Sequence, residues 1–66
     1  MTFIEIFTTR TCGYCFSAKR LLNSYNSVFK EVDVSSNMDN RNKMVSRSKG
    51  LTSVPQIFID KVHIGG

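Results

Sequence analysis

Apolar and polar residues follow two different periods along this chain, and the periods divide it into strands and helices. Residues 2–7 alternate and then become continuously apolar, which predicts a strand buried on both faces. Apolar residues recur at helical spacing over about 14–25, and residues 28–34 return to a mixed alternation that predicts a second strand. The helical stripe, expected to face inward, consists of Tyr14, Ala18, Leu21, Leu22 and Tyr25.

The second half of the chain predicts one further helix and two short strands. Residues 35–37 offer N-cap side chains to a helix over about 38–48, and Gly50 is a natural C-terminal stop. Residues 56–59 and 62–64 are strand-like, and the polar residues between them predict a tight turn. The expected apolar side of the second helix consists of Met38, Met44 and Val45.

The predicted order of elements is β-α-β-α-β-β, without a repeat, a linker or a low-complexity segment. A β-α-β start places its two strands parallel, whereas the final hairpin is antiparallel. The sequence therefore predicts an α/β fold with a four-stranded mixed sheet, in one domain that covers residues 1–66.

Length and composition indicate a small globular domain and argue against several other classes of protein. A chain of 66 residues lies near the lower limit for folding alone, and 41% hydrophobic residues are enough for a core. No apolar run is long enough for a membrane helix, and a strand pattern at the very start argues against a signal peptide. Two cysteines favour a reducing cytoplasm over a disulfide-stapled scaffold. The net charge of +4 comes from scattered basic residues without interleaved aromatic residues, so no nucleic-acid partner is expected.

Cys12 and Cys15 stand where the first strand gives way to the first helix. The unpaired N–H groups and positive dipole of a helix start stabilise a thiolate, which is the reactive form of cysteine. A C-x-x-C pair beside a β-α-β pattern is typical of thioredoxin-like redox proteins. A zinc site would need two further ligands, and this chain adds only His63. A purely structural disulfide would close a very short loop and stabilise little, so the placement favours redox chemistry.

Four segments together resemble the glutaredoxin family: Cys12-Gly13-Tyr14-Cys15, Thr52-Ser53-Val54-Pro55, Gln56-Ile57-Phe58-Ile59-Asp60 and His63-Ile64-Gly65-Gly66. They come in the order and spacing of that family, and the resemblance covers the whole chain. The resemblance implies a thioredoxin-like fold. It also implies a glutathione-dependent oxidoreductase that reduces disulfide-containing proteins and glutathione mixed disulfides.

The resemblance further implies a role for each thiol and for the bend before the third strand. Cys12 matches the nucleophile that attacks a glutathione mixed disulfide, and Cys15 matches the resolving thiol of the dithiol route. Val54-Pro55 matches a bend whose proline is cis, and the Val54 backbone there pairs with the peptide of glutathione. The implied glutathione contacts are Arg10, Tyr14, Arg41, Ser53, Val54 and Pro55.

Some of these contacts have alternatives. Tyr14 either lines the glutathione groove or only packs. Thr9 stands where the family often has a lysine, and Arg10 lies beside it. The contact from the second helix falls on Arg41 or on its neighbour Asn42. His63 has no partner pattern and is expected at the surface.

Two departures from the family pattern imply further alternatives. Gly13 replaces the proline of the commonest C-P-Y-C form, and members without that proline include carriers of a [2Fe–2S] cluster shared between two subunits. A cluster carrier with Cys12 and glutathione as ligands is therefore an alternative, and a non-catalytic interaction module is a third interpretation. Family members normally continue past Gly65-Gly66 into a final helix. With that helix absent, we expect bare apolar sheet surface and a homodimer or strand-exchanged dimer.

Overall fold

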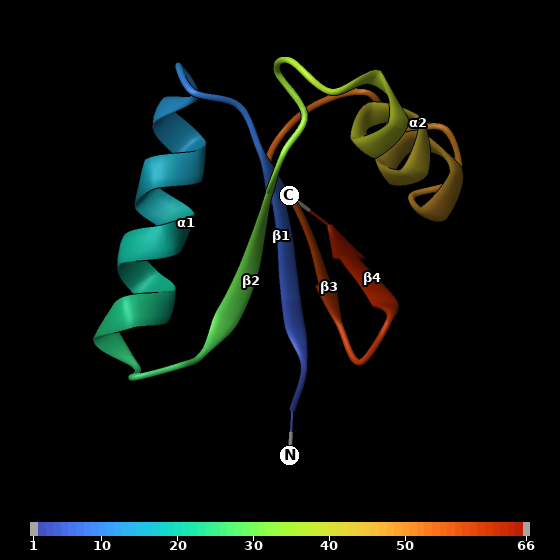
Figure 1. Ribbon diagram of the computed structural model, residues 1–66. Helices are drawn as coiled ribbons and strands as arrows, with labels where there is room; N and C mark the ends of the chain where they lie inside the picture. The colour runs from blue at the N-terminus through green and yellow to red at the C-terminus, as the bar shows by residue number, and fades with distance from the viewer. Residues whose placement is uncertain (1, 66) are drawn as a thin grey trace.

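The computed structural model describes residues 2–65 and contains a sheet with a helix on each side (Figure 1). The elements in chain order are β1 (Ile4–Thr8), α1 (Gly13–Ser24), β2 (Phe29–Asp33), α2 (Met38–Arg47), β3 (Gln56–Ile59) and β4 (Val62–Gly65). The strand order is β2-β1-β3-β4, with β1 parallel to β2 and the other pairs antiparallel. The predicted mixed sheet is confirmed, whereas the motif residue Gly66 lies outside the described residues.

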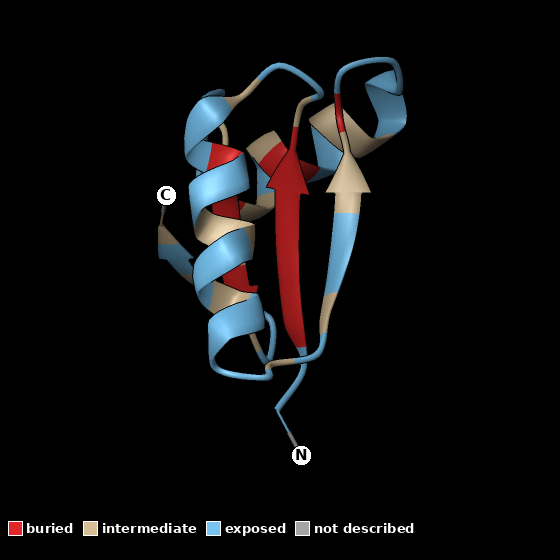
Figure 2. Cartoon of the chain, turned by 90° about the vertical axis from the view of Figure 1, so that its left-hand side faces the viewer, coloured by how far each residue is buried: buried red, intermediate tan, exposed pale blue. Residues whose placement is uncertain are grey.

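Strand β1 is the most deeply buried element. All five of its residues are buried, as predicted for a strand covered on both faces (Figure 2). The Thr8 hydroxyl donates to Glu31 of β2 at 2.8 Å, and the same carboxylate accepts from Lys19 of α1, so this face lies against α1. The core of the other face consists of Phe7, Val34, Met44 and Phe58, with Val32, Val45 and Val54 packed around it.

The inward stripe predicted for α1 is partly wrong. Its most exposed members are Tyr14, Leu21 and Tyr25, with exposed fractions of 81%, 57% and 73%. The more buried row keeps two predicted residues, Ala18 and Leu22, and adds Cys15 and Lys19. The prediction missed the rest of this row because it includes a lysine. Lys19 is tolerated there because its ammonium group pairs with Glu31 at 2.8 Å.

Helix α2 begins at a predicted cap and packs through one methionine. The Asn37 side chain accepts a hydrogen bond from the backbone N–H of Asn40 at 3.0 Å, so the expected N-cap segment is confirmed. Met44 is fully buried, but Met38 is 68% exposed. Met44 is six positions after Met38, and this places the two about 120° apart around the helix. Gly50 follows the helix with a φ of +100°, a conformation that favours glycine.

Asp60 and Lys61 form the predicted tight turn between β3 and β4, and both have positive φ, as hairpin turns require. Asp60 also holds the start of the chain, because its carboxylate accepts from the N–H of Phe3 at 2.8 Å. After the turn, Val62 and Ile64 of β4 are 62% and 60% exposed. Strand β4 therefore has two exposed apolar side chains over the described residues.

One ion pair joins the end of α2 to the centre of the sheet. Arg47 donates two hydrogen bonds to the Glu5 carboxylate of β1, at 2.7 and 3.1 Å. Its guanidinium carbon lies 4.3 Å from the ring centroid of Phe58 and 5.7 Å from that of Phe7. The hydrogen bond from Arg47 lowers the pKa of Glu5, against the opposing effect of burial. Because Glu5 is only 8% exposed, its carboxylate needs a positive partner inside the protein, and Arg47 provides it.

We expect Glu5→Gln to lower the melting temperature at neutral pH, because breaking a buried pair by removing one partner costs about 3–5 kcal/mol. The pKa of Glu5 is below its ordinary value of 4.5 in the folded protein. The contribution of the pair is therefore fully present above pH 4.5 and is lost as the pH falls through the lower folded value. Thermal melts of both proteins from neutral pH to about pH 3 measure this.

Glu31→Gln serves as the matched control, because Glu31 also pairs with a cation but its side chain is 40% exposed. It should cost less stability than Glu5→Gln at neutral pH. A gap between wild type and Glu5→Gln that stays constant down to the lowest pH would contradict the assignment.

Candidate active site

Cys12 is the N-cap residue of α1, directly before the helix begins at Gly13. Its sulfur accepts a hydrogen bond from the backbone N–H of Cys15 at 3.0 Å. The sulfur therefore accepts from one of the N–H groups that have no partner within the helix. Cys12 is half buried, and both cysteines are free thiols. The predicted placement of the pair at a helix start is confirmed.

Cys15 differs from Cys12 in its surroundings, although only two residues separate them. It is 1% exposed and lies on the row of α1 that faces the sheet. Burial, and next the hydrogen bond with the Cys12 side chain, raise the pKa of Cys15 to about 11. At neutral pH Cys15 is a protonated, covered thiol beside the accessible sulfur of Cys12.

The loop that enters β3 lies opposite Cys12. The Cys12 sulfur is 3.7 Å from the carbonyl oxygen of Val54, the second polar backbone atom that it contacts. The Val54–Pro55 peptide bond is cis, as the resemblance predicted. Pro55 is buried, Val54 packs against the core, and Ser53 is exposed. The structure thus brings the half-buried thiol of Cys12 against the half-buried residue Val54, next to the exposed Ser53.

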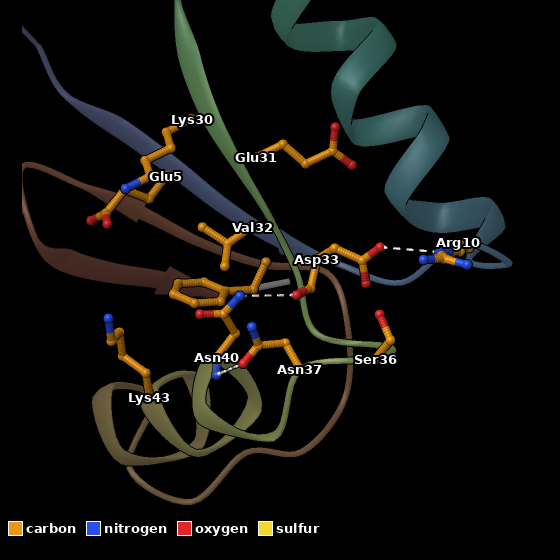
Figure 3. A pocket seen from close by; sticks show the side chains of 11 residues that line it. Glu5, Arg10, Lys30, Glu31, Val32, Asp33, Ser36, Asn37, Asn40 and Lys43 are labelled. Carbon is orange, nitrogen blue, oxygen red and sulfur yellow. Dashed lines mark hydrogen bonds and ion pairs between the residues drawn. The ribbon is translucent and has the colours of Figure 1, made fainter.

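The other predicted contact residues lie at varying positions around the thiols. Arg10 pairs with Asp33 at 3.4 Å, and its side chain is 74% exposed. Figure 3 shows this pair at one end of a pocket of about 510 Å³, which β2 and the start of α2 line. Neither cysteine lines that pocket. Tyr14, two positions after Cys12, is exposed, and Arg41 is half buried on α2.

His63 is not the surface residue that the sequence predicted. It is half buried, its Nε2 lies 2.7 Å from Oε1 of Gln56, and its ring centroid lies 5.0 Å from that of Phe58. Gln56 is 2% exposed, and sequence reasoning gave it no role of its own. The sequence did contain a signal for this burial, because Gln56 and Phe58 are two positions apart and so face the same side of a strand. A polar residue at a core-facing position needs a hydrogen-bond partner.

Comparison with known proteins decides the family. The family profile described as Glutaredoxin matches residues 4–64. Over 66 residues the chain is 50% identical to Glutaredoxin 3 of Escherichia coli (strain K12), a match that covers 100% of this chain and 78% of that protein. The chain belongs to the glutaredoxin family. The resemblance in the four sequence segments is therefore confirmed.

Solved glutaredoxin structures share the fold of this chain. The solution structure of glutaredoxin from Brucella melitensis is 41% identical with a TM-score of 0.77, and the match covers 96% of this chain and 67% of that one. The crystal structure of a buckwheat glutaredoxin–glutathione complex is 26% identical with a TM-score of 0.82, and covers 96% and 59%. The predicted thioredoxin-like fold is confirmed, and the chain spans 59% to 78% of the length of these relatives.

Two further findings concern the described part of this glutaredoxin. Over residues 2–65, neither helix has the length and apolar character needed to cross a bilayer. Within the same residues, no three histidine, cysteine or carboxylate side chains lie together as metal ligands. No observation on these residues favours the cluster carrier over the reductase.

We expect iodoacetamide to modify Cys12 and to spare Cys15 in the folded protein at neutral pH. Cys15 is covered, and with a pKa of about 11 it carries almost no thiolate. Peptide mass spectrometry after timed alkylation measures both sites. Modification of Cys15 should begin only as the pH approaches 11.

A Cys15→Ser variant is the control, and its Cys12 should be alkylated at a rate close to that of the wild type. Equal modification of the two thiols at neutral pH would contradict the asymmetry of the site.

Proposed function

We propose that this glutaredoxin reduces glutathione mixed disulfides and disulfide-containing proteins, with glutathione as the reductant. The observation that carries the proposal is the environment of the Cys12 sulfur. It lies 3.0 Å from a helix-start N–H and 3.7 Å from the Val54 carbonyl. The N–H stabilises a thiolate, and the exposed loop beside it offers backbone groups to a peptide-like substrate.

The monothiol route needs only Cys12 and two glutathione units. The Cys12 thiolate attacks the glutathionyl sulfur of the substrate, and the substrate leaves as a thiolate that takes a proton from water. Cys12 is then linked to glutathione by a disulfide. A free glutathione thiolate attacks the bound glutathionyl sulfur, forms glutathione disulfide and restores the Cys12 thiolate. The two electrons that reduce the substrate come from the glutathione pair.

The dithiol route adds Cys15. Cys12 attacks a protein disulfide and forms a mixed disulfide with one of its sulfurs, and the other sulfur leaves as a thiol. Cys15 loses its proton, attacks the Cys12 sulfur and releases the second substrate thiol. The Cys12–Cys15 disulfide is then reduced by two glutathione molecules. Burial and the Cys12 side chain raise the pKa of Cys15 to about 11, so in the free protein Cys15 is a thiol and Cys12 is the group that attacks first.

Glutathione recognition is assigned to the backbone of Val54, with its N–H and C=O paired to the glutathione peptide as an added strand. The buckwheat glutaredoxin–glutathione complex, a close structural match, supports glutathione as the ligand class. The charged and aromatic side chains around the thiols complete the proposed site. The assigned contacts are Arg10, Tyr14, Arg41, Ser53, Val54 and Pro55.

The proposal includes a cytoplasmic location, because a reducing compartment with a glutathione pool returns both cysteines to thiols. The domain assigned to this activity is residues 1–66. Self-association through the exposed apolar surface of β4 stays a prediction.

Replacing each cysteine separately tests the two routes. Cys12→Ser should abolish all activity, because no other group attacks sulfur. Cys15→Ser should retain reduction of a small glutathione mixed disulfide and lose reduction of a protein disulfide. A coupled assay with glutathione, glutathione reductase and NADPH measures both substrates.

The two serine variants serve as controls for each other, and their melting temperatures must be equal before their rates are compared. An equal loss of mixed-disulfide reduction in both variants would show that the two thiols do not divide the work in this way.

A further inference from the structure

Gln56 is a fully covered polar residue at the start of β3. It is 2% exposed, and it faces the same side of the sheet as Phe58 and the core beneath α2. A covered amide without partners is costly. Among the described residues, no buried side-chain nitrogen or oxygen lacks a partner, so the Gln56 amide is fully satisfied.

Its partners lie on two different segments. The Gln56 Nε2 donates to the carbonyl oxygen of Ser53 at 3.0 Å and to the Ser53 hydroxyl at 3.2 Å. Its Oε1 lies 2.7 Å from Nε2 of His63 on β4. The Ser53 carbonyl only accepts, so the amide nitrogen must face Ser53 and the oxygen must face His63. The His63 Nε2 therefore carries a hydrogen and donates it, whether the ring is neutral or charged.

The Ser53 carbonyl belongs to the same peptide group as the Val54 N–H. A trans peptide group is planar, and its C=O and N–H point in opposite directions. A hydrogen bond that fixes the Ser53 oxygen therefore fixes the direction of the Val54 N–H as well. Ser53 itself is exposed, and this amide is the contact that ties it to the core.

We infer that Gln56, with its amide held by His63, is a positioning residue that orients the Val54 backbone for the substrate. The inference rests on the proposed function, in which that backbone pairs with glutathione. Gln56 touches neither thiol, and it acts through the Ser53–Val54 peptide. His63 acts one step further away, through the orientation of the Gln56 amide.

Gln56→Leu keeps the approximate volume and removes both sets of hydrogen bonds. We expect the kcat/KM for a small glutathione mixed disulfide to fall about five- to tenfold, as the loss of a pre-oriented hydrogen-bond donor implies. The loss should lie mainly in KM. The iodoacetamide rate of Cys12 at alkaline pH should stay within about twofold of wild type, because alkylation needs the thiolate but no oriented backbone.

His63 variants and a stability control separate orientation from general damage. His63→Leu should lower kcat/KM in the same direction, and His63→Gln should restore it, because a glutamine amide donates from nearly the same place. Ile4→Val lowers stability at the other end of β1, where Ile4 is 8% exposed. At an equal loss of melting temperature it should leave kcat/KM close to that of the wild type.

Backbone order parameters of Ser53 and Val54 provide a readout independent of activity. In Gln56→Leu they should fall from the rigid range near 0.85 toward about 0.6, and in Ile4→Val they should not. Unchanged order parameters, or a kcat/KM loss no larger than in Ile4→Val, would overturn the inference. If wild type does not reduce the mixed disulfide at all, the proposed function fails. The order parameters alone then decide whether Gln56 positions the loop.

Discussion

Strand β1 is buried on both faces, so water cannot satisfy its polar side chains. Two of its five residues, Glu5 and Thr8, are polar and need partners within the protein. Each is satisfied from a different side. Arg47 at the end of α2 binds Glu5, whereas Thr8 donates to Glu31, which pairs with Lys19 of α1. Both helices are therefore held against the sheet by specific polar contacts as well as by apolar packing. A small core gains from such contacts, because they admit one arrangement of each helix.

The position of the reactive thiol follows from this central strand. The chain that leaves β1 reaches Cys12 within a short loop, and α1 then returns along the sheet. Because β3 is antiparallel to β1, with Phe7 opposite Gln56, the chain enters β3 at the same end of the sheet. Val54 and Cys12 thus meet across 42 residues of sequence. The candidate active site therefore lies where β1 ends and its neighbour β3 begins.

Local patterns predicted most of the fold, since strand alternation, caps and turn residues depend on near neighbours. The C-x-x-C pair at a helix start was predicted for the same reason. The errors concern side chains whose burial depends on distant partners. Lys19 faces the sheet because Glu31 neutralises it, and His63 is half buried because Gln56 accepts its hydrogen bond. The Arg47 partner of Glu5 lies 42 residues away, beyond any local pattern.

The central claim is that the site recognises glutathione and not merely any disulfide. A mixed disulfide between glutathione and a peptide has two sulfurs, and the proposed recognition at Val54 would select which one Cys12 attacks. The Cys15→Ser variant can be mixed with such a substrate, quenched in acid and analysed by mass spectrometry. The account predicts glutathione on Cys12 and the peptide released as a free thiol. Peptide on Cys12, or an even mixture of both adducts, would contradict it.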